Sequence, residues 1–227
     1  MKKNSGFTLL ELIVAVTIFA VTAVAIYSSF GVGITASRKA EVSYQVRQEA
    51  RHFFSVFSRD LRAAVNFTLL VDPKDQTKFK DSFEGSFDRV TFWRPLIIKG
   101  EGSKSVIKLT YYIKNDGIGP DGKETKSVCR KLQTYGETVK DEEGAGAESV
   151  LVSGISDFAL EYLYYTGEEI VWEKEWKKND ETAICTLPFG VKVSLAYPSK
   201  DDSKTVKFFE TVIIPAGSLN EKIGSAP

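Results

Sequence analysis

The sequence predicts an α+β fold in which one long N-terminal helix packs on an antiparallel β-sheet. Uncharged residues run without a break from 12 to 36, and apolar residues then recur at helical spacing to about residue 66. Beyond residue 71 the period changes to two, and apolar residues alternate with polar ones as they do in half-buried strands. A helix followed by a run of strands is typical of α+β domains, and the roughly 160 residues after the helix are enough for one compact domain.

Residues 12–36 read as a membrane-spanning helix. None of these 25 residues is charged. A helix of this length exceeds the roughly 30 Å of a hydrocarbon core, because each residue adds about 1.5 Å. Lys2 and Lys3 precede the segment while Arg38 and Lys39 follow it, so the positive-inside rule leaves the orientation nearly tied.

The helix is expected to continue beyond the membrane as an amphipathic helix. Its apolar residues recur at spacings of three, four and seven: Val42, Val46, Phe53, Phe57, Leu61 and Val65. Because no proline occurs before Pro73, residues 7–66 are predicted to form one rod of about 90 Å. Gly31 and Gly33 each weaken a helix by about 1 kcal/mol relative to alanine, which predicts a hinge or partial unwinding at 31–36.

Three aromatic residues crowd the end of this helix. Adjacent residues on a helix point about 100° apart, so Phe53, Phe54 and Phe57 cannot all face a single sheet. We therefore expect one of the three rings to remain available as a partner contact.

The strands are predicted from alternation. It is clearest at 107–114 and 189–197 and weaker at 87–94, 158–164 and 205–214. One half-buried face per strand is typical of an antiparallel sheet, here packed on the amphipathic helix. Residues 115–122 are rich in Gly, Asn and Asp and are predicted to be a turn, and residues 141–147, acidic and then rich in Gly and Ala, are predicted to be a solvated loop.

Composition and motifs disfavour several functions. Lys plus Arg and Asp plus Glu number 30 each, which gives no basic stripe for nucleic acid. The chain has one histidine, His52, expected on the helix surface, and neither a phosphate loop nor a metal-ligand cluster. We expect no catalytic residue, no cofactor and no metal. Calcium at 115–122 is the alternative, although this loop lacks the acidic spacing and terminal Glu of an EF-hand.

The two cysteines, Cys129 and Cys185, both fall in the polar domain. In an extracytoplasmic compartment such a pair predicts a disulfide, whose loop closure contributes roughly 4 kcal/mol. Two separate core thiols are the alternative.

Glu11 is a lone carboxylate at the start of the apolar run. A charge in lipid costs on the order of 3 kcal/mol at a helix centre and less near an end, and intramembrane ionisable residues usually have a function. Glu11 is therefore expected to need a partner.

The N-terminus resembles the type IV prepilin signal of pilins and pseudopilins. Residues 1–6 end in Gly6 and are followed by Phe-Thr-Leu-Leu-Glu-Leu-Ile-Val-Ala. The resemblance implies a leader at 1–6 that a prepilin peptidase removes after Gly6, N-methylation of the new terminal residue Phe7, and a transmembrane and polymerisation helix at 7–36. It also implies a periplasmic domain at 37–227, anchored in the bacterial inner membrane. An ordinary signal anchor or a secretory signal is the alternative.

Cleavage would place a positive charge on Phe7, four residues from Glu11. Pairing this amine with the carboxylate of a neighbouring helix offsets the desolvation of both groups and selects one axial offset between subunits. Glu11 is thus predicted to direct assembly.

The polar domain resembles the J-type minor pseudopilins of type II secretion. The resemblance rests on Phe-Ser-Arg-Asp-Leu-Arg-Ala-Ala at 57–64, on Trp172 and Trp176 ahead of Leu-Pro-Phe-Gly-Val at 187–191, and on Ile-Ile-Pro-Ala-Gly at 213–217. It implies a structural subunit that helps to initiate or cap the periplasmic pseudopilus for export of folded proteins. The implied partners are the I-type and K-type minor pseudopilins, in a tip complex, and other pseudopilins in the membrane.

Two alternatives stay open at this point. A minor pilin of a type IV pilus, acting in adhesion, DNA uptake or motility, shares all of the N-terminal chemistry. A monomeric membrane-anchored binding protein would not need Glu11. For Trp172 and Trp176, hydrophobic cover over a sheet and a partner-facing anchor are both open.

Overall fold

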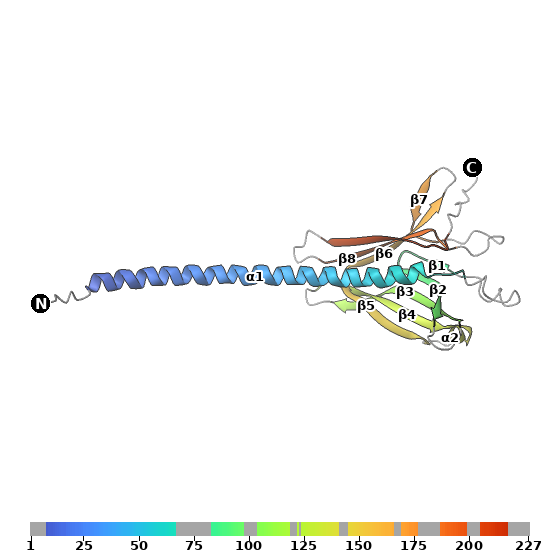
Figure 1. Ribbon diagram of the computed structural model, residues 1–227, viewed down its shortest axis with the longest axis horizontal. Helices are drawn as coiled ribbons and strands as arrows, with labels where there is room; N and C mark the ends of the chain where they lie inside the picture. The colour runs from blue at the N-terminus through green and yellow to red at the C-terminus, as the bar shows by residue number, and fades with distance from the viewer. Residues whose placement is uncertain are drawn as a thin grey trace. The chain divides into compact units, whose positions relative to one another are not determined.

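The computed structural model describes residues 8–66, 83–97, 104–118, 122, 124–140, 145–165, 169–176, 187–198 and 205–217. Contacts divide the chain into two compact units, Met1–Gln48 and Glu49–Pro227. Helix α1 (Leu9–Arg62) begins in the first unit and ends in the second (Figure 1).

Helix α1 is continuous over its 54 residues. The predicted hinge at 31–36 is therefore wrong. Two glycines weaken the helix by only about 2 kcal/mol together, which the hydrogen bonds of a long cooperative helix on both sides outweigh. The helix ends at Arg62, earlier than expected, because Val65 donates its N–H to the Trp93 carbonyl at 2.9 Å and so joins a strand.

The strands form two antiparallel sheets. The larger has the order β1-β2-β3-β4-β5, and consists of β1 (Phe83–Gly85), β2 (Arg89–Ile97), β3 (Lys104–Ile118), β4 (Glu124–Thr134) and β5 (Ala147–Ile155). The smaller has the order β7-β6-β8-β9, and consists of β6 (Asp157–Tyr165), β7 (Ile170–Glu173), β8 (Gly190–Tyr197) and β9 (Val206–Ile213). A short helix, α2 (Tyr135–Lys140), follows β4.

The α+β prediction is thus confirmed, with two sheets in place of the single one expected. The five predicted alternations correspond to β2, β3, β6, β8 and β9. The predicted turn at 115–122 is wrong in its first half, because β3 continues to Ile118. A register shift between Asn115 and Gly117, where Gly117 has a φ of 95°, lets the strand pass through this Gly-containing segment as a bulge.

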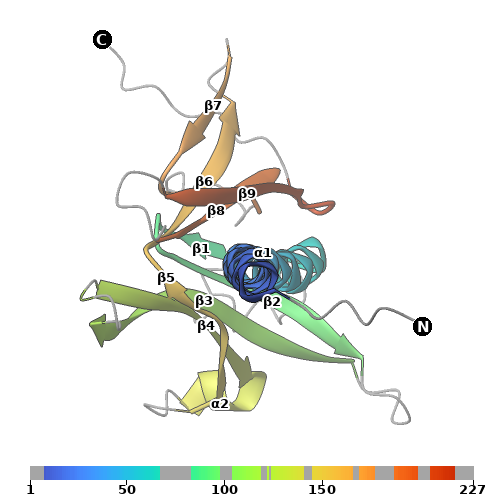
Figure 2. The same cartoon turned by 90° about the vertical axis from the view of Figure 1, so that its left-hand side faces the viewer.

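The last turns of α1 lie between the two sheets (Figures 1 and 2). Phe57 packs edge-on against Tyr111 of the large sheet at 5.0 Å between ring centroids. Phe53 packs edge-on against Phe158 of the small sheet at 6.2 Å. The core of this unit therefore forms around the helix, and both sheets turn their apolar faces toward it.

This arrangement contradicts the expectation that one ring of Phe53, Phe54 and Phe57 stays exposed. All three are buried, and Phe54, the most exposed, retains 7% of its surface. A helix covered by one sheet cannot bury rings that point about 100° apart, whereas a helix between two sheets can. The partner contact predicted for these rings has lost its support.

A buried carboxylate ties the helix end to the large sheet. Asp60 is fully buried. Its Oδ1 accepts a hydrogen bond from Arg94 at 2.6 Å, and its Oδ2 lies 2.6 Å from Arg130 and accepts from the Tyr111 hydroxyl at 2.6 Å. Burial, and then the neighbouring Asp60 charge, hold the pKa of Tyr111 well above its usual range, so the phenol remains a donor.

The two sheets are joined by hydrogen bonds to backbone carbonyl groups near β1. Trp176 donates its N–H to the Gly85 carbonyl at 2.9 Å, and the Tyr162 hydroxyl donates to the Ser86 carbonyl at 2.9 Å. A Cβ at Gly85 would lie 2.4 Å from the Tyr162 ring, so this close approach requires glycine. Trp176 is therefore part of the core, whereas Trp172, 38% exposed, lies on the outer face of the small sheet.

We predict that Asp60→Asn destabilises the second unit, Glu49–Pro227, by about 3 to 5 kcal/mol, because two arginines would then lie half-buried without a counter-charge. The matched control is Arg59→Gln. Arg59 is exposed and its Nε lies 3.9 Å from Asp60, so its loss is expected to cost less than about 1 kcal/mol. Urea unfolding of the full chain in detergent, followed by tryptophan fluorescence, measures both. Equal stability of the two variants would show that the Asp60 carboxylate is not the counter-charge that the two half-buried arginines need.

Candidate functional site

The first turn of α1 is capped by its own side chains. Glu11 accepts hydrogen bonds through Oε2 from the Thr8 backbone N–H and from the Thr8 hydroxyl, each at 3.0 Å. The Glu11 N–H donates in return to the Thr8 Oγ1 at 3.3 Å. This reciprocal arrangement is a capping box, which satisfies N–H groups that otherwise have no acceptor at a helix start.

Glu11 thus has a partner within its own chain. The partner expected for Glu11 was on a neighbouring helix, and Thr8 was missed although the Thr-x-x-Glu spacing predicts a cap. Gly6 and Phe7 lie outside the described residues. Cleavage after Gly6, methylation of Phe7 and the pairing of its amine with Glu11 therefore stay predictions.

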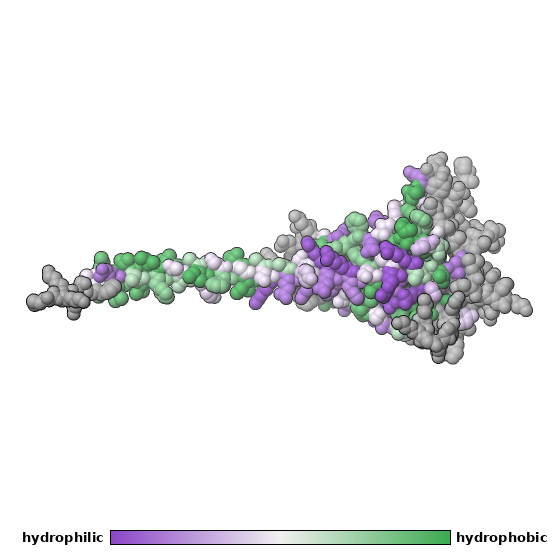
Figure 3. Space-filling model, in the orientation of Figure 1, coloured by the Kyte–Doolittle hydropathy of each residue, from purple (hydrophilic) through white to green (hydrophobic). Residues whose placement is uncertain are grey.

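The apolar part of α1 presents hydrocarbon to its surroundings. Its large side chains are exposed in the single chain, from Leu9 to Ile34, and Figure 3 shows apolar residues along the visible face of this stretch. Within the described ranges α1 is the one helix long and apolar enough to cross a membrane. This agrees with a single membrane anchor.

The serine and threonine hydroxyl groups between residues 12 and 36 are all bound by the helix itself. Thr17 donates to the Ile13 carbonyl at 2.8 Å and Thr22 to the Ile18 carbonyl at 2.7 Å. The same bond to a preceding carbonyl is made by Ser28, Ser29 and Thr35. These hydroxyls need no water, which removes the main penalty for placing them in lipid.

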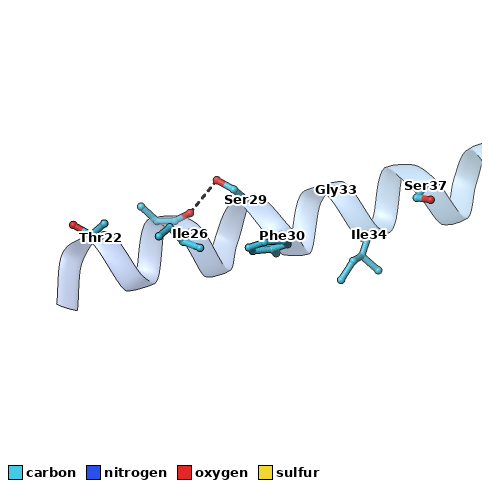
Figure 4. Close-up of a pocket in the computed structure, with 8 residues that line it drawn as sticks. Thr22, Ile26, Ser29, Phe30, Gly33, Ile34 and Ser37 are labelled. Atoms are coloured by element: carbon cyan, nitrogen blue, oxygen red, sulfur yellow. Dashed lines mark hydrogen bonds between the residues drawn. The ribbon is translucent and has the colours of Figure 1, made fainter. Parts of the chain in front are cut away.

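One face of the stretch is hollowed by small residues. Ala25, Ser29, Gly33 and Ser37 follow one another at intervals of four, with Phe30 and Ile34 beside them (Figure 4). Ser29 keeps its hydroxyl against the helix by donating to Ala25 at 2.9 Å. Small residues at this spacing let a second helix approach closely in a membrane. The groove therefore suits helix packing rather than a small ligand.

The structure describes only one of the two cysteines. Cys129 lies buried in β4 and has no disulfide partner among the described residues, but Cys185 lies outside them. The bridge between the two stays a prediction. Burial, and then the nearby carboxylate of Glu148, raise the pKa of the Cys129 thiol above its usual range.

The remaining candidates are less informative. His52 is exposed on α1, as expected. In the described part of the chain no three His, Cys, Asp or Glu side chains gather as a metal site requires. Three residues of the alternative calcium loop, 119–121, are not among those described.

Comparison with protein families matches residues 1–27 to the prokaryotic N-terminal methylation motif. The matched stretch contains the capped carboxylate and most of the apolar helix. No curated protein matches the chain. The match supports a protein of the pilin and pseudopilin class, which a prepilin peptidase processes and which assembles as pilins do.

The cap generates a prediction at the start of the helix. Thr8→Val removes the hydroxyl and is expected to weaken the first turn by about 1 kcal/mol, whereas Thr8→Ser retains the bond. Amide hydrogen exchange at Glu11, measured by NMR on the full chain in micelles, should be about fivefold faster in the valine variant and unchanged in the serine variant. Identical exchange in the two variants would show that the hydroxyl does not cap α1.

Proposed function

We propose that this chain is a J-type minor pseudopilin, a non-enzymatic subunit of a type II secretion system that helps to initiate or cap the periplasmic pseudopilus. The observation that carries the proposal is the N-terminal methylation motif at 1–27, which heads a long helix whose last turns pack between antiparallel sheets. The type of subunit rests on the resemblance of the polar domain, described above, to J-type sequences.

The residues of that resemblance occupy structural positions. Asp60, within 57–64, is the buried partner of two arginines. Trp176 and Leu187 are buried in the core of the unit. Their roles support a shared fold and leave the protein surface free to differ between subunit types.

In this proposal the peptidase cuts after Gly6 and frees the Phe7 amine beside the capped carboxylate. On assembly Glu11 exchanges its Thr8 contacts for the amine of an adjacent subunit, and the small-residue face of α1 receives a neighbouring helix. The single span lies in the bacterial inner membrane, and the domain that follows it lies in the periplasm. The proposed partners are the I-type and K-type minor pseudopilins and other pseudopilins in the membrane.

A second candidate is a minor pilin of a type IV pilus. The matched motif ends at residue 27, and both kinds of protein share the chemistry of this region. The two functions differ in what the assembled fibre does, and so they are separated by phenotype.

Processing provides the first test. The peptidase must accommodate the bond after Gly6 at the membrane surface, and a leucine side chain at this position is expected to block it. Gly6→Leu should leave a precursor that is heavier by its six leader residues and lacks the methyl group, as read by mass spectrometry of the full chain. Normal maturation of Gly6→Leu would sink the prepilin assignment.

Deletion and complementation provide the second test. Loss of the gene should retain folded exoenzymes inside the cell while surface pili and motility stay intact. When the deletion is complemented with Glu11→Val, the variant should insert in the membrane but should not restore secretion. The buried Phe7 amine of a neighbour then lacks its counter-charge, which costs about 3 to 5 kcal/mol. Glu11→Asp keeps the charge and serves as control. Normal secretion with lost pili would favour the type IV pilus instead.

A further inference from the structure

The small sheet ends in a long and regular edge strand. β9 pairs with β8 over eight consecutive residue pairs without a register shift. The other edges are blunted: β1 has three residues, β7 has four, and β5 pairs with β4 through two register shifts. Short strands and bulges are the usual means by which proteins prevent strand addition. β9 lacks both.

The free side of β9 is defined by its hydrogen bonds. Ile214 donates its N–H to the Phe189 carbonyl at 3.0 Å, toward β8. Because the backbone groups of an antiparallel strand alternate in direction, those of every second residue point away from β8. These residues are Lys207, Phe209, Thr211 and Ile213, and their N–H and C=O groups have no hydrogen-bond partner among the described residues.

The outer face of this edge carries two exposed apolar side chains, with Lys207 and Thr211 on the same face. Phe209 is 72% exposed and Ile213 is 44% exposed. A strand added to β9 would place every second side chain beside these two residues. Apolar side chains are therefore favoured at those positions of the added strand.

The helix face that touches the inner side of this edge carries two arginines, Arg51 and Arg62, called here the Arg51–Arg62 row. Ser58 donates to the Glu210 carboxylate of β9 at 2.5 Å, which fixes the face of the helix that touches this strand. Arg51 and Arg62 are rotated from Ser58 by only about 20° and 40°, on the side away from Phe53 and the interior strand β6. Both are exposed, and neither has a partner among the described residues. By this rotation they lie on the side of the helix next to the free edge of β9.

The two arginines flank Glu210 along the strand. Helix residues 51 and 62 lie about 10 Å before and about 6 Å after Ser58, since the rise is about 1.5 Å per residue. A strand rises by about 3.3 Å per residue. On this scale Arg51 lies level with Lys207 or Phe208, and Arg62 lies level with Val212. Acidic side chains are therefore favoured at two inward positions of an added strand, with a neutral one between them opposite Glu210.

We propose that the β9 edge and the Arg51–Arg62 row bind an extended strand of a partner protein. The strand alternates apolar residues with an inward series of acidic, neutral and acidic residues. Backbone hydrogen bonds to β9 provide the affinity, and the charge pattern provides the selectivity, as in other cases of strand addition. A second copy of β9 fits less well, because its inward residues include a single carboxylate, Glu210, which already accepts from Ser58. This inference does not depend on the choice between secretion and a pilus.

A symmetric peptide tests the proposal. We would use acetyl-Val-Glu-Val-Ser-Val-Glu-Val-amide, carrying a fluorescent label, with the full-length protein in a non-ionic detergent, and measure anisotropy. Its sequence is the same in both directions, so parallel and antiparallel addition are both sampled. The control peptide has Lys in place of each Glu. We expect saturable binding of the Glu peptide and at least tenfold weaker binding of the Lys peptide.

Two sets of variants locate the site. Thr211→Pro removes an outward N–H and should weaken binding at least tenfold, whereas Thr211→Ala keeps the N–H and should bind within twofold of the parent. The pair Arg51→Glu and Arg62→Glu should reverse the preference toward the Lys peptide. Arg59→Glu, on a helix face about 100° from Ser58, should change affinity less than twofold. Tryptophan-monitored melting checks that each variant folds.

Several outcomes would overturn the proposal. They are equal binding of the two peptides, unchanged binding by Thr211→Pro, and loss of binding by Arg59→Glu alone. Self-association of the full chain that Thr211→Pro abolishes, without peptide binding, would assign the edge to a second copy. If Thr211→Pro fails to fold, the arginine variants decide the result, because they alter only exposed side chains.

Discussion

The buried pairing of the Asp60 carboxylate with Arg94 and Arg130 is the interaction on which the folded unit depends. Asp60 is placed on the last turn of α1, where the helix meets the large sheet, and it gathers Arg94, Arg130 and Tyr111 from three strands. A buried ion pair adds little net stability compared with apolar packing, but it tolerates few alternative arrangements. Its value here is to fix how far the helix slides and how it rotates between the sheets. The rings of Phe53 and Phe57 then reach opposite walls of the core.

The sequence indicated what depends on local pattern. The apolar stretch of α1 follows from its uncharged run, whereas the amphipathic turns and strands such as β3 and β8 follow from periodicity, because each has one buried face. β4 was missed because Ser127, Val128 and Cys129 are buried in succession, which removes the alternation. The Asp60 cluster was missed because its partners lie far apart in sequence. The second sheet was missed for the same reason, since only tertiary structure decides which strands pair.

The two parts of α1 provide hydrogen-bond partners for their polar side chains by different means. In the apolar stretch, hydroxyls such as Thr17 and Thr22 bond to the helix's own carbonyls, and the sole carboxylate binds Thr8. In the folded unit, the buried polar groups of Ser58 and Asp60 find partners on separate strands. Self-sufficiency suits a helix surrounded by lipid. Dependence on distant partners makes the other part cooperative with its sheets.

The Thr8–Glu11 cap has a consequence for the timing of assembly. Because the Glu11 carboxylate already has hydrogen-bond donors in its own chain, a single subunit would be stable in the bilayer and could accumulate before any fibre exists. In the proposed assembly, joining a neighbour replaces the Thr8 contacts of Glu11 by a contact with the neighbour's amine, so the net gain from this residue is smaller than the full strength of an ion pair. The carboxylate would thus discriminate between aligned and misaligned neighbours more than it would drive growth. A subunit bound at the wrong axial offset would regain its own Thr8–Glu11 contacts on dissociating. The fibre could therefore release misaligned subunits as it forms.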